Sequence, residues 1–223
     1  MSRRSQRAFT LLEVAIVIAI ALVLATLGYS SLSRLRPRAH LSDAASELTA
    51  LVHGARQQAL ATGHNVAVLV FPDYVGPNGT GRVIIYEDGD FNLFNAAANP
   101  NFANYNPAVP AHGPNSTLIA TWDVPSSVTI GPLTGAGAAA VLPAPYATIP
   151  VNADCSFCGA LALRRGAVVF DAHGYASFYS NVGLALPNLT GGSLSLAAPD
   201  VNGQRTLLVT AATGSVTLWN QGG

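Results

Sequence analysis

The chain contains one long apolar run, between residues 9 and 33, in which Glu13 is the sole charged side chain. An α-helix rises 1.5 Å per residue, so these 25 residues would form a helix of about 37 Å. The hydrocarbon core of a bilayer is about 30 Å thick. The hydropathy pattern therefore predicts a single transmembrane helix at residues 9–33.

A second apolar pattern, with the period of an α-helix, follows between residues 34 and 63. Apolar side chains recur there at steps of four and three, which places them on one helix face. This apolar stripe consists of Leu41, Ala45, Leu48, Val52, Ala55 and Ala59. Gly63 comes directly after the last repeat and suits the C-cap position. We expect an amphipathic continuation of the first helix.

Two residues weaken this long helix near the junction of its halves. Pro37 has no N–H to donate to the carbonyl of Ser33, and its ring crowds the preceding turn. Gly28 adds a softer point within the apolar half. We expect the helix to kink at Pro37 and Gly28.

Beyond residue 63 the period of the pattern changes from 3.6 to 2, which is typical of β-strands. Ten short stretches are separated by turn signals such as Asp88-Gly89, which favour antiparallel neighbours. The predicted strands are 65–71, 82–87, 91–94, 117–122, 127–131, 167–171, 175–180, 193–197, 206–211 and 215–219. The pattern thus predicts an α+β fold, with the long kinked helix packed on an antiparallel β-sheet body at residues 64–223.

Two stretches break the β pattern, and we expect both to be long surface loops. Residues 95–116 are rich in Asn, Pro and Ala, and residues 132–159 are rich in Gly, Ala and Pro. Loops of this length in a compact domain usually carry function, so they are candidates for partner specificity. No linker separates a second domain from the body.

The charges are unevenly distributed, although the formal net charge of the chain is zero. After Arg38 the sequence holds five arginines and ten carboxylates, which gives the body a net charge of −5. Nucleic-acid binding depends on basic clusters that displace counterions from phosphates. We therefore expect no nucleic-acid partner for the body. The adjacent pair Arg164 and Arg165 fits a solvated strand edge.

Glu13 is placed at the start of the predicted span, where a carboxylate needs a partner or a function. An acidic side chain within the hydrocarbon costs about 3 kcal/mol. If the chain were cut between Ala8 and Phe9, the new α-amino group of Phe9 would lie one helical turn from Glu13. It could also lie near the same glutamate of a neighbouring copy. Alternatively, Glu13 could extend to the membrane interface.

The N-terminal residues Arg3, Arg4, Arg7, Ala8, Phe9, Thr10, Leu11, Leu12 and Glu13 resemble the start of type IV pilins and type II secretion pseudopilins. That family carries a basic leader, a small residue, an N-methylated Phe and a Glu at the fifth mature position. The resemblance implies that a prepilin peptidase removes leader residues 1–8 and methylates Phe9. Ala8 departs from the Gly that usually precedes the cut.

Two other interpretations of the N-terminus stay open. A secretory signal peptide would also combine a basic region with an apolar region, but its apolar region is discarded, whereas a cut after Ala8 would retain it. A simple signal-anchor is the second alternative. Charge does not settle its topology, because Arg34, Arg36 and Arg38 follow the span as densely as the leader arginines precede it.

Cys155 and Cys158, the two cysteines of the chain, form a C-x-x-C pair. A zinc site would need two further ligands, and the five histidines lack a suitable spacing. A thioredoxin-like redox pair should lie where a strand enters a helix, and no helix pattern follows here. We favour a small disulfide that fixes a surface loop in an oxidising compartment such as the periplasm.

Three body segments resemble the H-type pseudopilins and their FimT-like minor pilin relatives. They are residues 45–70, with Ala55, Arg56 and Ala59, and the strand-turn-strand segments 168–174 and 205–216. The resemblance implies a single-pass inner-membrane subunit with a periplasmic body, assembled with other pseudopilins or pilins by an inner-membrane platform. It implies a structural subunit of a type II secretion pseudopilus or, alternatively, a minor type IV pilin in pilus assembly or DNA uptake.

Signals for catalysis or cofactor binding are weak. The chain contains no G-x-S-x-G elbow, P-loop or H-E-x-x-H motif, so we expect no enzyme and no cofactor. A thiol oxidoreductase that uses Cys155 is the enzymatic alternative. Glu87, Asp88 and Asp90 could bind calcium, but they lack the ligand series of an EF-hand. We claim no metal site and expect a solvated turn.

Overall fold

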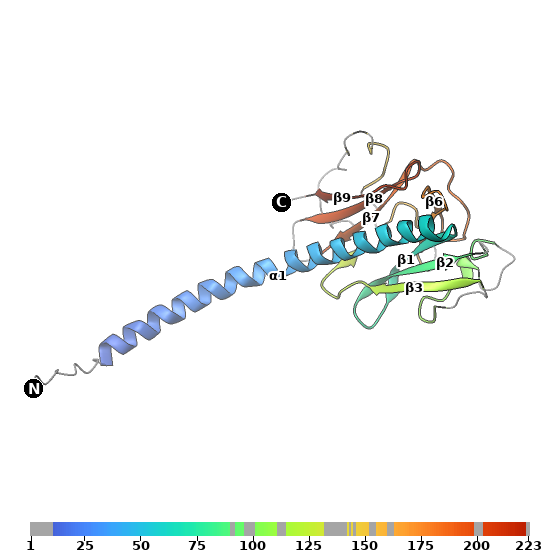
Figure 1. Cartoon of the computed structure of the whole chain (residues 1–223). Coiled ribbons are helices and arrows are strands. Elements are labelled where there is room, and N and C mark those ends of the chain that lie inside the picture. The colour runs from blue at the N-terminus through green and yellow to red at the C-terminus, as the bar shows by residue number, and fades with distance from the viewer. Residues whose placement is uncertain are drawn as a thin grey trace, which may run out of the picture.

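The structure is a computed structural model that describes ten parts of the chain. These are residues 11–89, 92–95, 101–110, 115–131, 142, 144, 146–151, 155–159, 163–198 and 203–221, with the side chains of residues 27–35 left out. Helix α1 (Leu11–Thr62) is continuous over 52 residues. Its first half projects away from the body, and its second half lies across the β-strands (Figure 1).

The second half of α1 packs as the apolar stripe predicts. All six stripe residues, from Leu41 to Ala59, are at most 2 % exposed. The helix ends at Thr62, and Gly63 follows with a φ of 72°, which favours glycine. The N–H of Gly63 donates to the carbonyl of Ala59 at 3.0 Å. The predicted C-cap is therefore confirmed.

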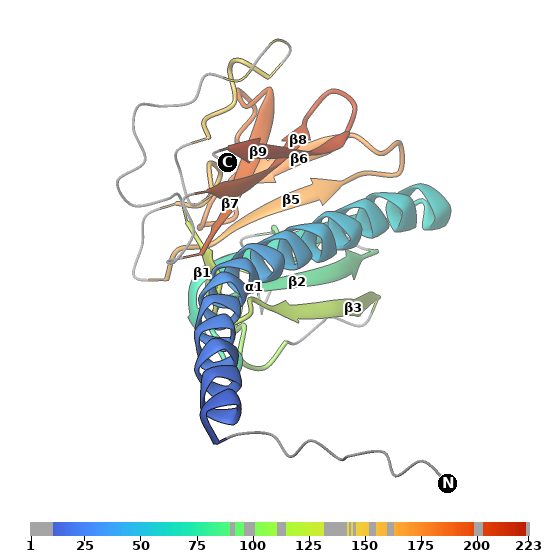
Figure 2. The same ribbon diagram turned by 90° about the vertical axis from the view of Figure 1, so that its left-hand side faces the viewer.

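Helix α1 changes direction between its projecting half and its packed half (Figure 2). Pro37 lies inside the helix, which continues on both sides of it. The predicted cause of this bend, a kink at Pro37 and Gly28, stays a prediction.

The described residues of the body contain nine strands in two antiparallel sheets (Figure 1). The first sheet has the order β3-β2-β1-β5-β6, and the second has the order β4-β7-β8-β9. The strands are β1 (Asn65–Val75), β2 (Thr80–Asp88), β3 (Ser116–Asp123), β4 (Thr129–Ile130), β5 (Gly166–Phe170), β6 (Ala176–Tyr179), β7 (Gly191–Ala197), β8 (Gln204–Thr210) and β9 (Val216–Gln221). The α+β class and the antiparallel pairing are confirmed, with two sheets in place of one.

Nine of the ten predicted strands coincide with observed strands, and the prediction at residues 91–94 is wrong. Residues 93 and 94 lie in a turn. Leu93 is 3 % exposed, and its N–H donates to the Asp88 carboxylate at 2.9 Å. Leu93 and Phe94 therefore pack on the core from a turn, which the period-2 pattern does not distinguish from a strand, while Phe91 lies outside the described residues.

The apolar stripe and the inner faces of both sheets enclose the main core. The opposite face of the first sheet carries a second core, to which Phe102 and Tyr105 contribute. The second sheet is covered on its other face by Leu142, Ile149 and Val151. The two long stretches expected to be surface loops thus contain cover segments with buried residues, defined here as residues 101–110 and the described residues 142, 144 and 146–151.

Candidate functional site

The projecting half of α1 exposes apolar side chains on every side. Between residues 11 and 24 the exposed fractions of the large apolar side chains range from 47 % to 89 %. They are Leu11, Leu12, Val14, Ile16, Val17, Ile18, Ile20, Leu22, Val23 and Leu24. A helix that is apolar all round is stable when lipid or other helices surround it. This half of α1 is the candidate assembly site.

Glu13 lies in the first turn of α1 and is exposed. A carboxylate at this end of a helix interacts favourably with the helix dipole. Ala8 and Phe9 lie outside the described residues. The predicted cleavage between them, the methylation of Phe9 and its pairing with Glu13 therefore stay predictions.

Within the part of the chain that the structure describes, no helix combines the length and hydropathy that crossing a membrane requires. The predicted span at residues 9–33 begins outside the described residues.

Arg56 joins the three body segments on which the family resemblance rests. Its Nε donates to the carbonyl of Gly174 at 3.3 Å, and its Nη2 donates to the carbonyl of Thr213 at 3.0 Å. Gly174 and Gly214 both adopt positive φ, at 78° and 58°. The end of α1 thereby holds the turn after β5 and the turn after β8 together. The sequence singled out these segments but not their contact.

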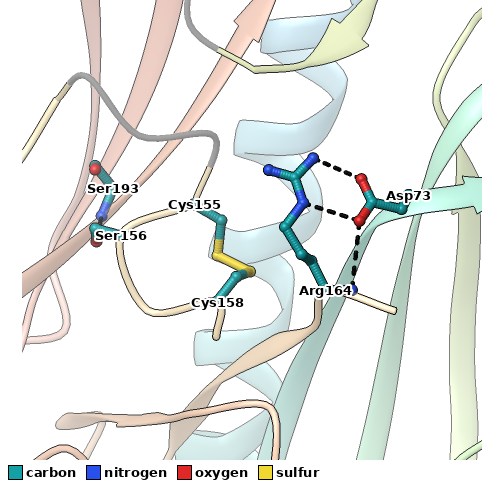
Figure 3. Close-up of a disulfide and its surroundings, with 6 residues drawn as sticks. All are labelled: Asp73, Cys155, Ser156, Cys158, Arg164 and Ser193. Carbon is teal, nitrogen blue, oxygen red and sulfur yellow. Dashed lines mark hydrogen bonds and ion pairs between the residues drawn. A yellow bond between two sulfur atoms is a disulfide. The ribbon is translucent and has the colours of Figure 1, made fainter. Parts of the chain in front are cut away.

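The two cysteines form a disulfide with an S–S distance of 2.04 Å, as predicted. Its turn is fixed to β7, because the N–H of Ser193 donates to Oγ of Ser156 at 2.8 Å and Ser156 returns a backbone bond to Ser193 at 2.9 Å (Figure 3). Both sulfurs are therefore engaged with each other in this structure, and neither is a free thiol.

Arg164 binds Asp73 beside the disulfide (Figure 3). Nη2 of Arg164 donates to one oxygen of Asp73 at 2.5 Å, and Nε donates to the other at 2.8 Å. These hydrogen bonds lower the pKa of Asp73 and raise the pKa of Arg164. The pair joins the end of β1 to the segment that precedes β5.

The prediction of a solvated edge at Arg165 is wrong, because this side chain is 8 % exposed. Its Nη1 donates to three carbonyls of the cover segment 101–110, those of Phe102, Ala103 and Tyr105, each at 3.0 Å. Burial lowers the pKa of Arg165. The charged group thus binds the backbone of a segment that the sequence presents only as a loop.

Arg82 holds the same cover segment from β2. Its Nε and Nη2 bind the two oxygens of Asp123 at 2.5 and 2.9 Å, and its Nη1 donates to the carbonyl of Pro107 at 2.6 Å. The guanidinium also lies 4.3 Å from the centre of the Tyr74 ring. Sequence reasoning missed this residue, since an arginine with the strand period gives no sign of its partners.

Two of the three candidate calcium ligands already bind protein donors. Glu87 accepts hydrogen bonds from Gln58 at 3.1 Å and interacts with the His64 ring at 2.8 Å. Burial alone would raise the pKa of Glu87, but these two contacts outweigh it and lower the value. Asp88 accepts from Ser116 at 3.1 Å, in addition to Leu93. Asp90 lies outside the described residues.

Comparison with known proteins identifies the N-terminus. Residues 3–29 match the model of the prokaryotic N-terminal methylation motif. No curated protein matches the chain significantly. No solved structure matches it significantly either. The motif makes this chain type IV pilin-like at its N-terminus, the kind of protein that prepilin peptidase processes.

Proposed function

We propose that this chain is a minor structural subunit of a periplasmic pseudopilus that serves type II protein secretion. The observation that carries the proposal is the projecting apolar half of α1, most of which lies within the matched methylation motif and which contains Glu13 near its start. The body buries the second half of the same helix and leaves the first half available. Such a chain suits packing through its first half into a bundle of similar helices.

The proposed assembly step depends on charge in a low-dielectric setting. Prepilin peptidase cleaves between Ala8 and Phe9 and methylates the new amine. The helix, held as a single span in the inner membrane, then moves into the filament with the help of the assembly platform. There Glu13 pairs with the Phe9 amine of an adjacent subunit. A wrong register leaves a buried charge without its partner, which is strongly unfavourable.

The first test replaces Glu13 with Gln in the full chain and measures incorporation into filaments by sedimentation and cross-linking. Breaking one buried ion pair costs about 3–5 kcal/mol, so we expect incorporation to fall at least about tenfold. Glu47→Gln is the matched control, because Glu47 is exposed on the packed half of α1. Equal incorporation of both variants would contradict the proposal.

A second measurement tests processing. The intact mass and the N-terminal residue of the protein from native membranes should show a methylated Phe9 and no leader. A working subunit that still carries Met1 would refute the proposed route.

The alternative role, a minor type IV pilin in pilus assembly or DNA uptake, is separable by a gel-shift measurement. A DNA-uptake subunit should bind DNA at moderate salt through basic residues. We expect no shift, because the body carries a net charge of −5. Clear binding by the body would favour the alternative over the secretion role.

A further inference from the structure

Two arginines and a histidine occupy the short stretch of α1 between its projecting half and its packed half. Arg36, Arg38 and His40 are all exposed, and the buried stripe begins at Leu41. Among the described residues, neither arginine forms an ion pair with a carboxylate. Two guanidinium groups are therefore available at the point where the body begins.

The positions of the two arginines indicate whether their partner surrounds the helix, as a membrane does, or contacts one side of it, as a protein does. Successive residues of an α-helix are about 100° apart, so Arg36 and Arg38 lie on nearly opposite sides of α1. Their separation along the axis is only about 3 Å. A protein partner would contact one side of the helix, whereas a membrane surface surrounds it at one level.

The distance along the helix also fits a membrane surface. From Leu11 to Arg36, α1 rises about 37 Å, which exceeds the hydrocarbon thickness of about 30 Å by the depth of a headgroup layer. Long arginine side chains can reach phosphates at that level. The apolar side chains between residues 11 and 24 would then lie in the hydrocarbon.

We propose that Arg36 and Arg38 form a basic ring around α1 that binds the phosphates of anionic phospholipids while the subunit waits in the membrane. This inference rests on the proposed function, because it requires the projecting half of α1 to be inserted. An acidic body is repelled by an anionic surface, and the basic ring offsets that repulsion where the body meets the bilayer.

The test measures how the full chain distributes between two vesicle populations. One population is phosphatidylcholine alone, and the other consists of dense vesicles that also contain about 30 mol % phosphatidylglycerol, an anionic lipid. Both are mixed with the chain in detergent. The detergent is removed, the vesicles are separated by density, and the protein in each is measured. Insertion of the apolar half contributes equally to both populations, so the ratio reports the headgroup preference.

The variants are Arg36→Gln/Arg38→Gln and, as the charge-retaining control, Arg36→Lys/Arg38→Lys. Each cation near an anionic surface adds to the free energy of binding. Removing two should therefore lower the preference for the anionic vesicles about 30-fold. The Lys variant should stay within about threefold of the unaltered chain. In 1 M salt, where the Debye length is about 3 Å, the preference should largely disappear.

The outcomes separate the inference from the proposed function. If the Gln variant keeps the preference, the basic ring is wrong although the helix still inserts. If the Lys variant loses the preference as fully as the Gln variant, positive charge is not its source and the basic ring is wrong, because an anionic surface attracts Lys and Arg alike. If the chain enters neither population, the proposed membrane-held subunit itself fails.

Discussion

Gly54 and Gly214 occupy very different environments, although both are glycines next to residues that hold the body together. Gly54 lies in the middle of α1, and a Cβ added there would meet no atom within 4 Å. Gly214 has a φ of 58°, and a Cβ added there would lie within 1.9 Å of the Gly174 carbonyl oxygen. The turns held by Arg56 therefore require a glycine at residue 214.

Replacing each glycine with Ala should change stability in opposite directions. Gly54→Ala should raise the free energy of unfolding by about 1 kcal/mol, because Ala favours the helix. Gly214→Ala should lower it by at least about 2 kcal/mol, because of the positive φ and the clash. Urea unfolding of the full chain in mild detergent measures both. A neutral Gly214→Ala variant would contradict the close approach of the two turns.

The Asp73–Arg164 pair predicts a pH dependence of stability. The pKa of Asp73 is lower in the folded chain than its ordinary value of 3.8, so the pair stabilises the fold above pH 3.8. That stabilisation is lost as the pH falls through the lower, folded pKa. Both side chains are more than a third exposed, so the effect should stay below about 1 kcal/mol.

A double-mutant cycle with Asp73→Asn and Arg164→Gln checks this dependence. The coupling free energy, measured by urea unfolding, should be fully present at pH 6 and should decrease progressively as the pH is lowered below 3.8. Either single variant should flatten the same part of the pH profile. A coupling that does not decrease as the pH is lowered below 3.8 would rule out the ion pair as its source.

At the scale of elements, the cover segment 101–110 depends on two buried arginines. The guanidinium of Arg165 binds three of its carbonyls, and Arg82 binds a fourth. The hydroxyl of Tyr105 is buried without a hydrogen-bond partner among the described residues, and burial raises its pKa to about 12. Apolar burial and the arginines must therefore offset an unfavourable polar group.

Arg165→Met should release this cover segment more than the rest of the body. The substitution keeps much of the side-chain volume but leaves three carbonyls without their donor, at a cost of about 2–4 kcal/mol. Limited proteolysis should then cut within residues 101–110 at a higher rate. Arg205→Met, on β8 of the other sheet, is the control. Equal protection in both variants would show that Arg165 does not hold the segment.

The strands and the packed half of α1 could be predicted because their apolar residues repeat with a regular period. The stripe from Leu41 to Ala59 is an example, since each of its residues reports the same face. The cover segments have no such period. Their burial depends on single long-range contacts, such as Arg165 with Phe102, which join residues about 60 positions apart and leave no local signal.

At the scale of the whole molecule, three kinds of surface follow one another along the chain. They are the apolar first half of α1, a short basic stretch and an acidic body. The candidate assembly site was predictable because it is a contiguous stretch of sequence, from Glu13 onward. The contact of Arg56 with two distant turns was not predictable, because its partners are backbone carbonyls, which every residue carries.

The continuity of α1 has a mechanical consequence. Because α1 is continuous, a pull on its first half is transmitted along the helix to the packed second half, where the six stripe residues share the load. Each of their dispersion contacts is weak, but together these contacts are strong. A motor that pulls the N-terminal half of α1 out of the membrane would therefore move the folded body with it.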